Sequence, residues 1–389
     1  MSKLNGEFTT IGWDIGGAHL KAVQLDAGGR VLHALQLPCQ LWRGLHTLES
    51  AMQTVLQTFK TKPEYAHHAI TMTGELVDLF ENRHHGVLQI AQFAEKLLGQ
   101  NCQFYAATIS TNTHGLNTSS LNTRGFVNID QVAPNTGYIA SANWHASASA
   151  LAQHVNDALF VDIGSTTTDI IAIEAGHVSS AALSDAGRLQ QDTLIYTGVI
   201  RTPVMALAQK ISFAGLQTNV MAEYFATMAD VYRLTNELSP AVDMAETADD
   251  QGKSQQQSAR RLARMVGFDV EDKPMSVWVE LAYVCKEIQL KQLKVAILKH
   301  LKPNTPIIGA GAGSFLVAQL AAELNCTYRT IDSALATDPA LMSNTTLFNG
   351  QSSDLLAANL LQHNNLAVCF PAYAVAYLSF NHQTEANQA

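Results

Sequence analysis

The sequence predicts an α/β protein of two domains, and three observations lead to that prediction. The chain has 389 residues, whereas single hydrophobic cores stop growing near about 250–300 residues. A strand that ends in an aspartate and a glycine turn, followed by a second strand, occurs at 8–25 and again at 159–173. A strand that enters a helix through a glycine-rich turn occupies 306–324. The restart of the first pattern predicts domains at 1–156 and 157–389, with a C-terminal helix that can pack back on the first domain.

Periodicity in the first half predicts a sheet flanked by helices. Short apolar runs separated by tight glycine turns are typical of an antiparallel meander, and apolar residues three and four apart indicate helices. We expect strands at 8–15, 20–25, 30–37, 66–73, 104–107 and 126–129, and helices at 46–59, 88–98 and 143–156.

The second half repeats the scheme with longer helices and polar connections. We expect strands at 159–163, 169–173 and 306–309 and helices at 218–234, 260–266, 277–300, 315–324 and 371–380. Two polar stretches, 185–203 and 239–258, are predicted to be loops.

Composition excludes several classes of protein. Apolar residues make up 47% and charged residues only 15% of the chain, the opposite of the balance that produces disorder. The formal net charge is −9 with no run of Lys or Arg, which argues against a nucleic-acid partner because such partners favour a basic surface. The low charge content indicates extensive burial and is compatible with a homodimer.

The cysteines and the N-terminus predict a soluble, cytoplasmic protein without a membrane partner. Five widely spaced cysteines form no CxxC pair, so neither a zinc ribbon nor a disulfide framework is indicated. Free thiols suit a reducing cytosol. Residues 1–10 lack the apolar core of a signal peptide, and no run approaches the roughly 20 apolar residues of a membrane helix.

Three glycine turns carry the candidate chemistry. In the first, Asp14 ends a strand before Gly16 and Gly17. Glycines leave backbone N–H groups open to an anion, and the aspartate can orient a hydrated Mg2+ that carries phosphate. The second turn repeats the carboxylate and glycine and adds hydroxyls that can donate to phosphate; its residues are Asp162, Gly164, Ser165, Thr166 and Thr167. The third places Gly309, Gly311 and Gly313 before a helix, where an anion or nucleotide can bind.

Two better-known nucleotide motifs do not fit these residues. A dinucleotide fingerprint fails at Ser314 or Leu316, depending on the register. A P-loop ending at Lys253 would need a glycine where Thr247 stands, and no strand precedes it. The order DxGG, DxGSTT and GAGAG at wide spacing is more specific than any one of the three turns alone.

In this order of turns the chain resembles the actin/Hsp70/sugar-kinase superfamily. The resemblance implies two RNase H-like domains with mixed sheets flanked by helices, facing each other across a central cleft, each with a phosphate-binding hairpin. Within that superfamily the chain is most similar to the hydantoinase/oxoprolinase type, and more narrowly to tetrahydromethanopterin-linked C1-transfer proteins and the synthase of methanofuran biosynthesis. The segments that carry the narrower resemblance are 12–21, 72–76, 196–203, 223–233 and 261–267.

The resemblance implies roles for further residues. Lys21 and Arg201 are expected to contact phosphate, Arg201 because a planar guanidinium suits it, and Asp14 and Asp162 to organise Mg2+. Glu75 and Asp230 are candidates for a general base. One departure from the kinase pattern is that Ala18 and His19, rather than Thr or Ser, follow the first turn.

The function that the resemblance implies is a transferase of methanofuran- or methylofuran-type C1-carrier biosynthesis. It would condense a small phosphorylated substrate, an aminomethylfuran diphosphate, with a tyramine- or tyrosine-derived phenol and release diphosphate, with Mg2+ as cofactor. The missing hydroxyl after the first turn weakens an ATP-kinase interpretation. Two alternatives stay open: an ATP-dependent small-molecule kinase or ATP-coupled hydrolase, and a non-catalytic nucleotide-binding scaffold.

Overall fold

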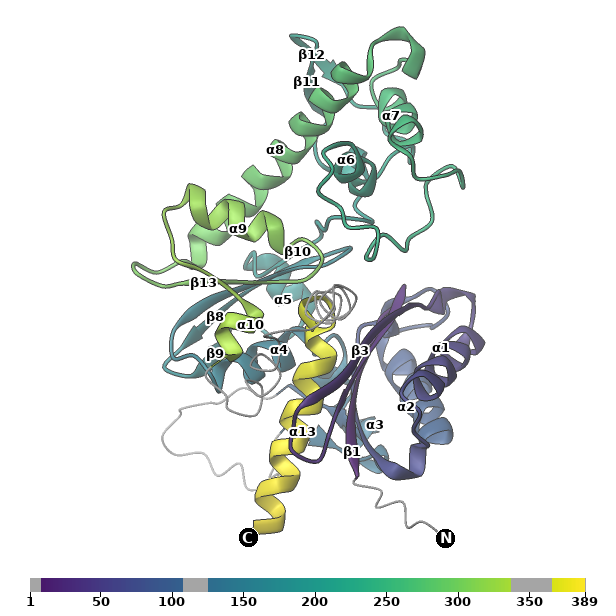
Figure 1. Ribbon diagram of the computed structural model, residues 1–389, viewed down its shortest axis with the longest axis vertical. Helices are drawn as coiled ribbons and strands as arrows, with labels where there is room; N and C mark the ends of the chain where they lie inside the picture. The colour runs from purple at the N-terminus through teal and green to yellow at the C-terminus, as the bar shows by residue number, and fades with distance from the viewer. Residues whose placement is uncertain (1–7, 108–124, 337–365, 389) are drawn as a thin grey trace, which may run out of the picture. The chain divides into compact units, whose positions relative to one another are not determined.

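A computed structural model describes residues 8–107, 125–336 and 366–388 (Figure 1). Contacts within the chain divide it into two compact units. Unit 1 comprises Met1–Asp157, Ile173–Arg188 and Ile331–Ala389, and unit 2 comprises Ala158–Ala172 and Leu189–Thr330. The division into folding domains after residue 156 stays a prediction.

The sheet of unit 1 has the strand order β3-β2-β1-β4-β5-β6. Its strands are β1 (Thr9–Ile15), β2 (His19–Leu25), β3 (Val31–Pro38), β4 (Ala66–Met72), β5 (Cys102–Tyr105) and β6 (Phe126–Val127). The first three strands form the expected antiparallel meander, whereas β1, β4 and β5 are parallel. Parallel neighbours need crossover connections, and the helices that follow β3 and β4 supply them.

Helices cover both faces of this sheet. They are α1 (Leu45–Thr58), α2 (Arg83–Leu98), α3 (Ile129–Ile139), α4 (Asn143–Ala152) and α13 (Phe370–Gln388). Unit 1 also contains α10 (Ile331–Leu335) and most of α5 (Asp185–Gln190). Ile11, Trp13 and Ile15 alternate along β1 and pack in one core with residues of α1, α2 and α3. On the opposite face Gly12 lies against α13, where a Cβ would stand 1.9 Å from the Ala372 carbonyl oxygen. Glycine at this position lets α13 lie directly along β1, as Figure 1 shows.

The second sheet has the order β10-β8-β7-β13-β14, with β9 paired to β8. Its strands are β7 (Ala158–Ile163), β8 (Thr168–Glu174), β9 (His177–Ser179), β10 (Leu194–Ile195), β13 (Ile307–Ala310) and β14 (Tyr328–Thr330). Here β7 lies between β8, which follows the glycine turn, and the parallel strand β13. In unit 1, β1 lies in the same way between β2 and the parallel strand β4. Both sheets therefore confirm the predicted RNase H-like α/β fold.

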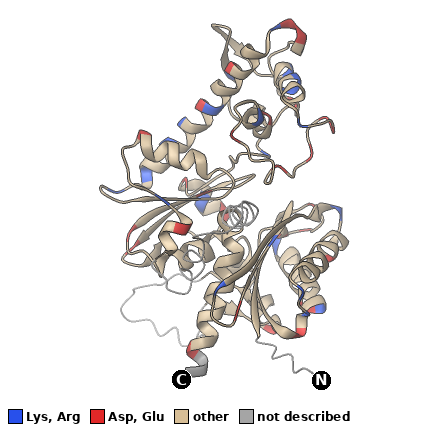
Figure 2. Cartoon of the chain, in the orientation of Figure 1, with Lys and Arg blue, Asp and Glu red and all other residues tan. Residues whose placement is uncertain are grey.

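The helices of unit 2 form one large core with β7 and β13. They are α6 (Met228–Leu234), α7 (Gln255–Arg264), α8 (Met275–His300) and α9 (Ser314–Glu323), and a separate hairpin joins β11 (Lys210–Phe213) to β12 (Leu216–Asn219). Charged residues lie mostly on helices and loops rather than on strands (Figure 2). None of the helices in the described ranges is long and apolar enough to span a bilayer.

Three predicted segments were wrong at least in part. The loop expected at 239–258 ends before α7, which begins at Gln255. The helix expected at 218–234 is confined to α6, because the side chains of Thr227 and Asp230 cap a new helix start there. The loop expected at 185–203 contains α5 and the short strand β10. Other elements were not predicted at all, among them the hairpin of β11 and β12 and the helix α3, which has Pro134 and Gly137 inside it.

Candidate functional site

The first turn, residues 14–17, lies between β1 and β2 of unit 1. Asp14 is the last-but-one residue of β1 and is buried, and its cross-strand partner Lys21 places Nζ 3.3 Å from Oδ2. The other carboxylate oxygen, Oδ1, is buried and has no hydrogen-bond partner in the described part of the chain. Gly16 and Gly17 are half-buried. A charged pair with a buried acceptor oxygen thus stands at the entrance of a glycine turn.

The segment after β4 packs directly on this turn. The Thr73 N–H donates to the carbonyl oxygen of Ile15 at 2.9 Å. A Cβ on Gly74 would lie 3.2 Å from the same oxygen and 3.3 Å from the carbonyl carbon of Gly16. Glu75 follows in the 3-10 helix η3 (Gly74–Leu76). The parallel pairing of β1 with β4 therefore brings Glu75 to the edge of unit 1 that carries the first turn.

Glu75 is a buried carboxyl group with one engaged and one unengaged oxygen. Its Oε1 accepts a hydrogen bond from the Ser141 hydroxyl at 2.7 Å, whereas Oε2 has no partner among the described residues. Burial raises the pKa of Glu75 to about 7, with a smaller contribution from the charge of Asp185, while the Ser141 hydrogen bond and Arg83 oppose the rise. A carboxyl group with a pKa near neutrality is suited to take up and release a proton.

The second turn, residues 162–167, joins β7 to β8 in unit 2. The Gly164 N–H donates to the Thr167 carbonyl oxygen at 2.8 Å, which closes the turn. Gly164, Ser165, Thr166 and Thr167 are all half-buried. The other three amides and the hydroxyls of this turn form the short polar stretch for which phosphate binding is predicted.

The third glycine turn packs against the second. β13 pairs with β7 so that Ala310 is opposite Asp162, and a Cβ on Gly311 would stand 2.3 Å from the Asp162 carboxylate oxygen Oδ1. Gly313 donates its N–H to the Ile163 carbonyl oxygen at 2.8 Å, and Gly309 lies against Tyr328. All three glycines are buried, so their close packing supports the position of Asp162. Direct phosphate binding by them stays a prediction.

A loop at 196–203 forms backbone hydrogen bonds to the second turn. The N–H groups of Val199 and Arg201 donate to the carbonyl oxygens of Gly164 and Ser165, respectively, at 3.1 and 2.8 Å. Gly198 fits closely, because a Cβ there would lie 2.5 Å from the Thr166 nitrogen. The side chain of Arg201 is exposed. The backbone geometry thus places Arg201 beside the second turn.

Gln289, from the middle of α8, holds this loop. It is fully buried, and its amide nitrogen donates to Thr197 Oγ1 at 2.8 Å and to the Gly198 carbonyl oxygen at 2.9 Å. The hydroxyl of Tyr232 donates to its amide oxygen. The sequence did not predict a role for Gln289, because the residue lies within a long helix. A polar residue on the buried side of that helix was the one feature that could have indicated it.

We expect Gly311→Ala to distort the second turn, because the added methyl group would collide with Asp162. This effect should exceed that of the backbone strain that any alanine with a left-handed φ causes. Gly311 and Gly215 have nearly the same left-handed φ, +79° and +80°, but nothing lies within 4 Å of a Cβ on Gly215. Gly215→Ala is therefore the control for backbone strain, worth roughly 1–2 kcal/mol. In urea unfolding, Gly311→Ala should lose clearly more stability than this control, and calorimetry should show weaker binding of inorganic diphosphate. Equal behaviour of the two variants would contradict the packing role of Gly311.

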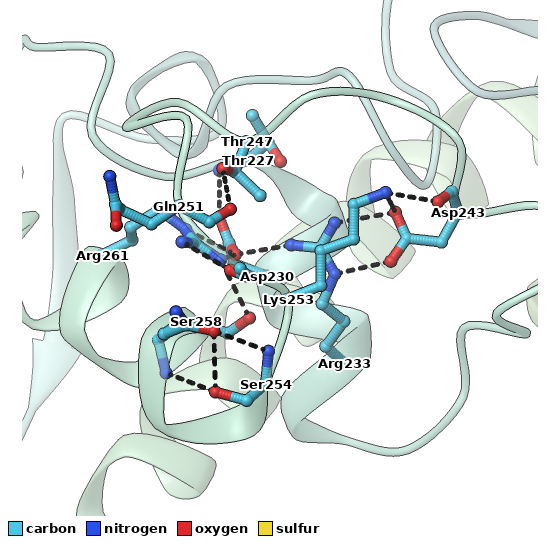
Figure 3. Close-up of polar contacts among 12 residues, drawn as sticks. Thr227, Asp230, Arg233, Asp243, Thr247, Gln251, Lys253, Ser254, Ser258 and Arg261 are labelled. Atoms are coloured by element: carbon cyan, nitrogen blue, oxygen red, sulfur yellow. Dashed lines mark hydrogen bonds and ion pairs between the residues drawn. The ribbon is translucent and has the colours of Figure 1, made fainter. Parts of the chain in front are cut away.

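Asp230 lies in a dense ion-pair network in unit 2 (Figure 3). Its Oδ1 accepts from Arg261 Nη2 at 2.7 Å, Arg261 Nε at 2.9 Å and Arg233 Nη1 at 2.8 Å, and its Oδ2 accepts from the Thr227 N–H at 3.1 Å. Arg233 also binds Asp243 through two 2.7 Å hydrogen bonds. These contacts favour a structural role for Asp230, and its role as a general base stays a prediction.

The loop at 239–254 is fixed by the same network. Arg261 Nη1 donates to Asp249 Oδ1 at 2.9 Å and to the Gly252 carbonyl oxygen at 3.1 Å. Lys253 Nζ lies 3.3 Å from Asp243 Oδ1, so this lysine is engaged within the loop (Figure 3). The network thereby ties the polar stretch to α6 and α7.

Comparison with known proteins gives one matching family and two related enzymes. A family model described as hydantoinase/oxoprolinase matches residues 98–337. A protein of Methanocaldococcus jannaschii named (4-{4-[2-(gamma-L-glutamylamino)ethyl]phenoxymethyl}furan-2-yl)methanamine synthase is 32% identical over 262 residues, 67% of this chain and 72% of that protein. A protein of the same name from Methanococcus vannielii is 30% identical over 169 residues, 42% of this chain and 76% of that protein.

Among solved structures, a nucleotide-free acetone carboxylase has a TM-score of 0.50 to this chain. The match covers 94% of this chain and 70% of that one at 10% sequence identity. At this identity the likeness concerns the fold alone.

Proposed function

The chain belongs to the hydantoinase/oxoprolinase family, and on that premise we propose that it is a transferase that joins a phenol to a furanylmethyl diphosphate through an ether bond. The name of the two related synthases describes a product with a phenoxymethyl group on a furan that also bears a methanamine. In such a product an ether oxygen and one methylene carbon join the phenyl ring to the furan. We infer that the donor is an aminomethylfuran diphosphate and the acceptor a tyramine- or tyrosine-derived phenol. The product would belong to a methanofuran-type C1 carrier.

The observation that carries this proposal is the position of Glu75. The reaction forms a bond between the phenol oxygen and the furanylmethyl carbon, breaks the bond from that carbon to diphosphate, and releases the phenol proton. Glu75 is a buried carboxyl group with a free oxygen and a pKa of about 7, next to a glycine turn. Ionised Glu75 accepts the phenol proton at Oε2. The electron-rich furan stabilises positive charge on the reacting carbon, so modest activation of the phenol is sufficient.

Residues of the first turn would neutralise the leaving group. Diphosphate gains negative charge as it departs, and Lys21 with the Gly17 amide supplies positive potential beside it. The Gly16 N–H is engaged, because it donates to the His19 carbonyl oxygen at 3.0 Å and closes the turn. The unpartnered Oδ1 of buried Asp14 fits a water molecule of hydrated Mg2+, a cation that prefers oxygen ligands. When bound, the ion would offset charge on the diphosphate oxygens. Considered by itself, the second turn of unit 2 has hydroxyls and Arg201 that can bind phosphate and a carboxylate, Asp162, that can organise a metal ion.

The reaction is tested by incubating the protein with Mg2+, an aminomethylfuran diphosphate and a set of tyramine- and tyrosine-derived phenols. We expect an ether product by mass spectrometry and one diphosphate released for each ether formed. A parallel incubation contains ATP in place of the aminomethylfuran diphosphate, together with each of the same phenols. ATP turnover without ether formation would overturn the proposal in favour of a kinase or an ATP-coupled hydrolase, and binding of either ligand without turnover would favour a scaffold.

We expect Asp14→Asn to raise the Mg2+ concentration that gives half-maximal activity by about 10-fold or more, since groups that orient metal-bound ligands affect affinity by that amount. Chelation with EDTA should abolish wild-type activity, and excess Mg2+ should restore it. Asp26→Asn is the matched control, because Asp26 pairs with Arg30 in an exposed turn of the same sheet. An Asp14→Asn enzyme with the wild-type Mg2+ response would contradict the assignment.

A further inference from the structure

A chain of hydrogen bonds in unit 1 leads from Glu75 toward the surface. The Ser141 hydroxyl lies 2.7 Å from Glu75 Oε1 and 3.3 Å from Asp185 Oδ2. Arg83 Nη2 then binds the same Asp185 oxygen at 2.6 Å. Exposure increases along the chain, from 1% for Glu75 and 7% for Ser141 and Asp185 to 41% for the Arg83 side chain. A buried carboxyl group is thus connected to solvent through one hydroxyl and a second carboxylate.

Ser141 is held in an unusual backbone conformation at the centre of this chain. Its φ of +51° is in the left-handed region, which non-glycine residues seldom adopt. The preceding residue, Ala140, forms an isolated bridge with Met72 at the end of β4, and α4 begins two residues after Ser141. Strained residues of this kind persist where the surrounding structure fixes them, and they concentrate at functional sites. In this conformation the hydroxyl lies between the two carboxylates.

One hydroxyl proton cannot serve both carboxylates at once. When Glu75 is ionised, Ser141 donates to it across the shorter contact. When Glu75 is protonated, it becomes a donor to the Ser141 oxygen, and the hydroxyl proton is free to turn to Asp185. The geometry therefore has two hydrogen-bond states that differ by the position of a proton.

We propose that Ser141 and Asp185 are positioning residues that relay the substrate proton from Glu75 to solvent. This proposal rests on the proposed function, in which each turnover leaves one phenol proton on Glu75. The ether bond forms, the carbon–oxygen bond to diphosphate breaks, and Glu75 takes the proton at Oε2. Rotation of the carboxyl group presents that proton to Ser141, whose own hydroxyl proton passes to Asp185 and then to water. No electron is gained or lost, and Glu75 returns to its ionised form.

The charged groups around Glu75 are few in the described part of the chain. Asp185 faces it from α5 and Arg83 from α2, the helix that packs on η3 through Gly86. The two histidines of α2 next to Arg83 have other contacts: His84 bonds to Thr136 at 2.9 Å, and His85 packs edge-on against Phe80. The relay is therefore tested by changing Ser141 and Asp185 alone.

Ser141→Gly is the sharpest variant, because glycine adopts the positive φ without strain and the side chain that carries the hydroxyl is removed. Asp185→Asn keeps the size of the side chain and removes the proton acceptor. Ser147→Ala is the matched control, since its buried hydroxyl donates to the Asn143 carbonyl oxygen within α4, away from Glu75 and Asp185 among the described hydrogen bonds. We expect both relay variants to lose at least about 10-fold in kcat with little change in KM, the lower end of proton-transfer effects, and the control to keep wild-type values.

The pH profile separates a relay from a merely structural effect. Loss of the Ser141 hydrogen bond raises the pKa of Glu75, so the acid limb of kcat/KM should move to higher pH in Ser141→Gly. Loss of the Asp185 charge lowers the pKa of Glu75, so the limb should move to lower pH in Asp185→Asn. Wild-type protein that forms no ether would overturn the proposed function and the relay with it. Active wild type beside fully active variants, or variants whose limbs do not move apart, would overturn the relay alone.

Discussion

Glu75→Gln is expected to lower kcat by about 10²–10⁴-fold, the usual contribution of a positioned general base. Glutamine keeps the shape of the side chain and an oxygen that accepts from Ser141, so substrate binding should change little. In the wild type, kcat/KM should fall as the pH drops below about 7, because the base must be ionised and its pKa is raised to about 7 by burial. The residual activity of the variant should lack this acid limb.

The same substitution should make the protein more stable at alkaline pH. The pKa of Glu75 is about 7 in the folded chain and 4.5 when unperturbed, so the folded state binds more protons between these values. Stability therefore decreases as the pH rises from 4.5 to 7 and is constant above that. Above pH 7 the ionised buried carboxylate costs up to about 3 kcal/mol, which glutamine avoids.

Urea unfolding at pH 5 and pH 8 checks this expectation. The stability gain of Glu75→Gln over wild type should be larger at pH 8 than at pH 5. Glu64→Gln, at an exposed position in the same unit, should change neither stability nor turnover. A Glu75→Gln enzyme that is fully active and gains no stability would show that Glu75 neither takes the proton nor is held with a raised pKa.

The glycine turns and Glu75 could be located from sequence because local rules fix them. Asp14 and Asp162 both end strands before glycines, and the position of Glu75 follows from the end of β4, which lies parallel to β1. In such sheets the carboxyl ends of parallel neighbours share an edge. These features depend on residues close together in the chain or on a single strand pairing.

Ser141, Asp185 and Gln289 could not be found in this way. Ser141 contacts carboxylates 66 and 44 residues away in sequence, and neither spacing follows from a local pattern. Gln289 reaches Thr197 and Gly198 only because α8 packs behind their loop. Similarly, the pairing of Asp230 with Arg261 spans 31 residues, which no helix spacing predicts. The contact of Asp230 with Arg233, three residues further along α6, is of the kind that helix spacing does predict, and the structure contains both ion pairs.

Arg261→Met is expected to lower the free energy of unfolding by about 3–5 kcal/mol, because removing one partner leaves buried charge without its main counterion. Arg261 is fully buried, forms two hydrogen bonds to Asp230 and holds Asp249 and the Gly252 carbonyl. Arg260→Met, on the exposed side of the same helix, provides the control for lost helix-surface charge. A cost no larger than that of Arg260→Met in urea unfolding would contradict the prediction.

The double variant Arg261→Met/Asp230→Leu separates lost packing from unpaired charge. If the uncompensated Asp230 carboxylate causes the instability, the double variant should be more stable than Arg261→Met alone, since Arg233 keeps its bonds to Asp243. The effect should also reach the second turn. The N–H groups of Met228 and Ala229, at the start of α6, donate to the carbonyl oxygens of Thr202 and Ile200, respectively. The N–H group of Ile200 in turn donates to the carbonyl oxygen of Ser165 in the second turn. Weaker diphosphate binding in Arg261→Met than in Arg260→Met would therefore show that the network positions the phosphate turn as well as stabilising unit 2.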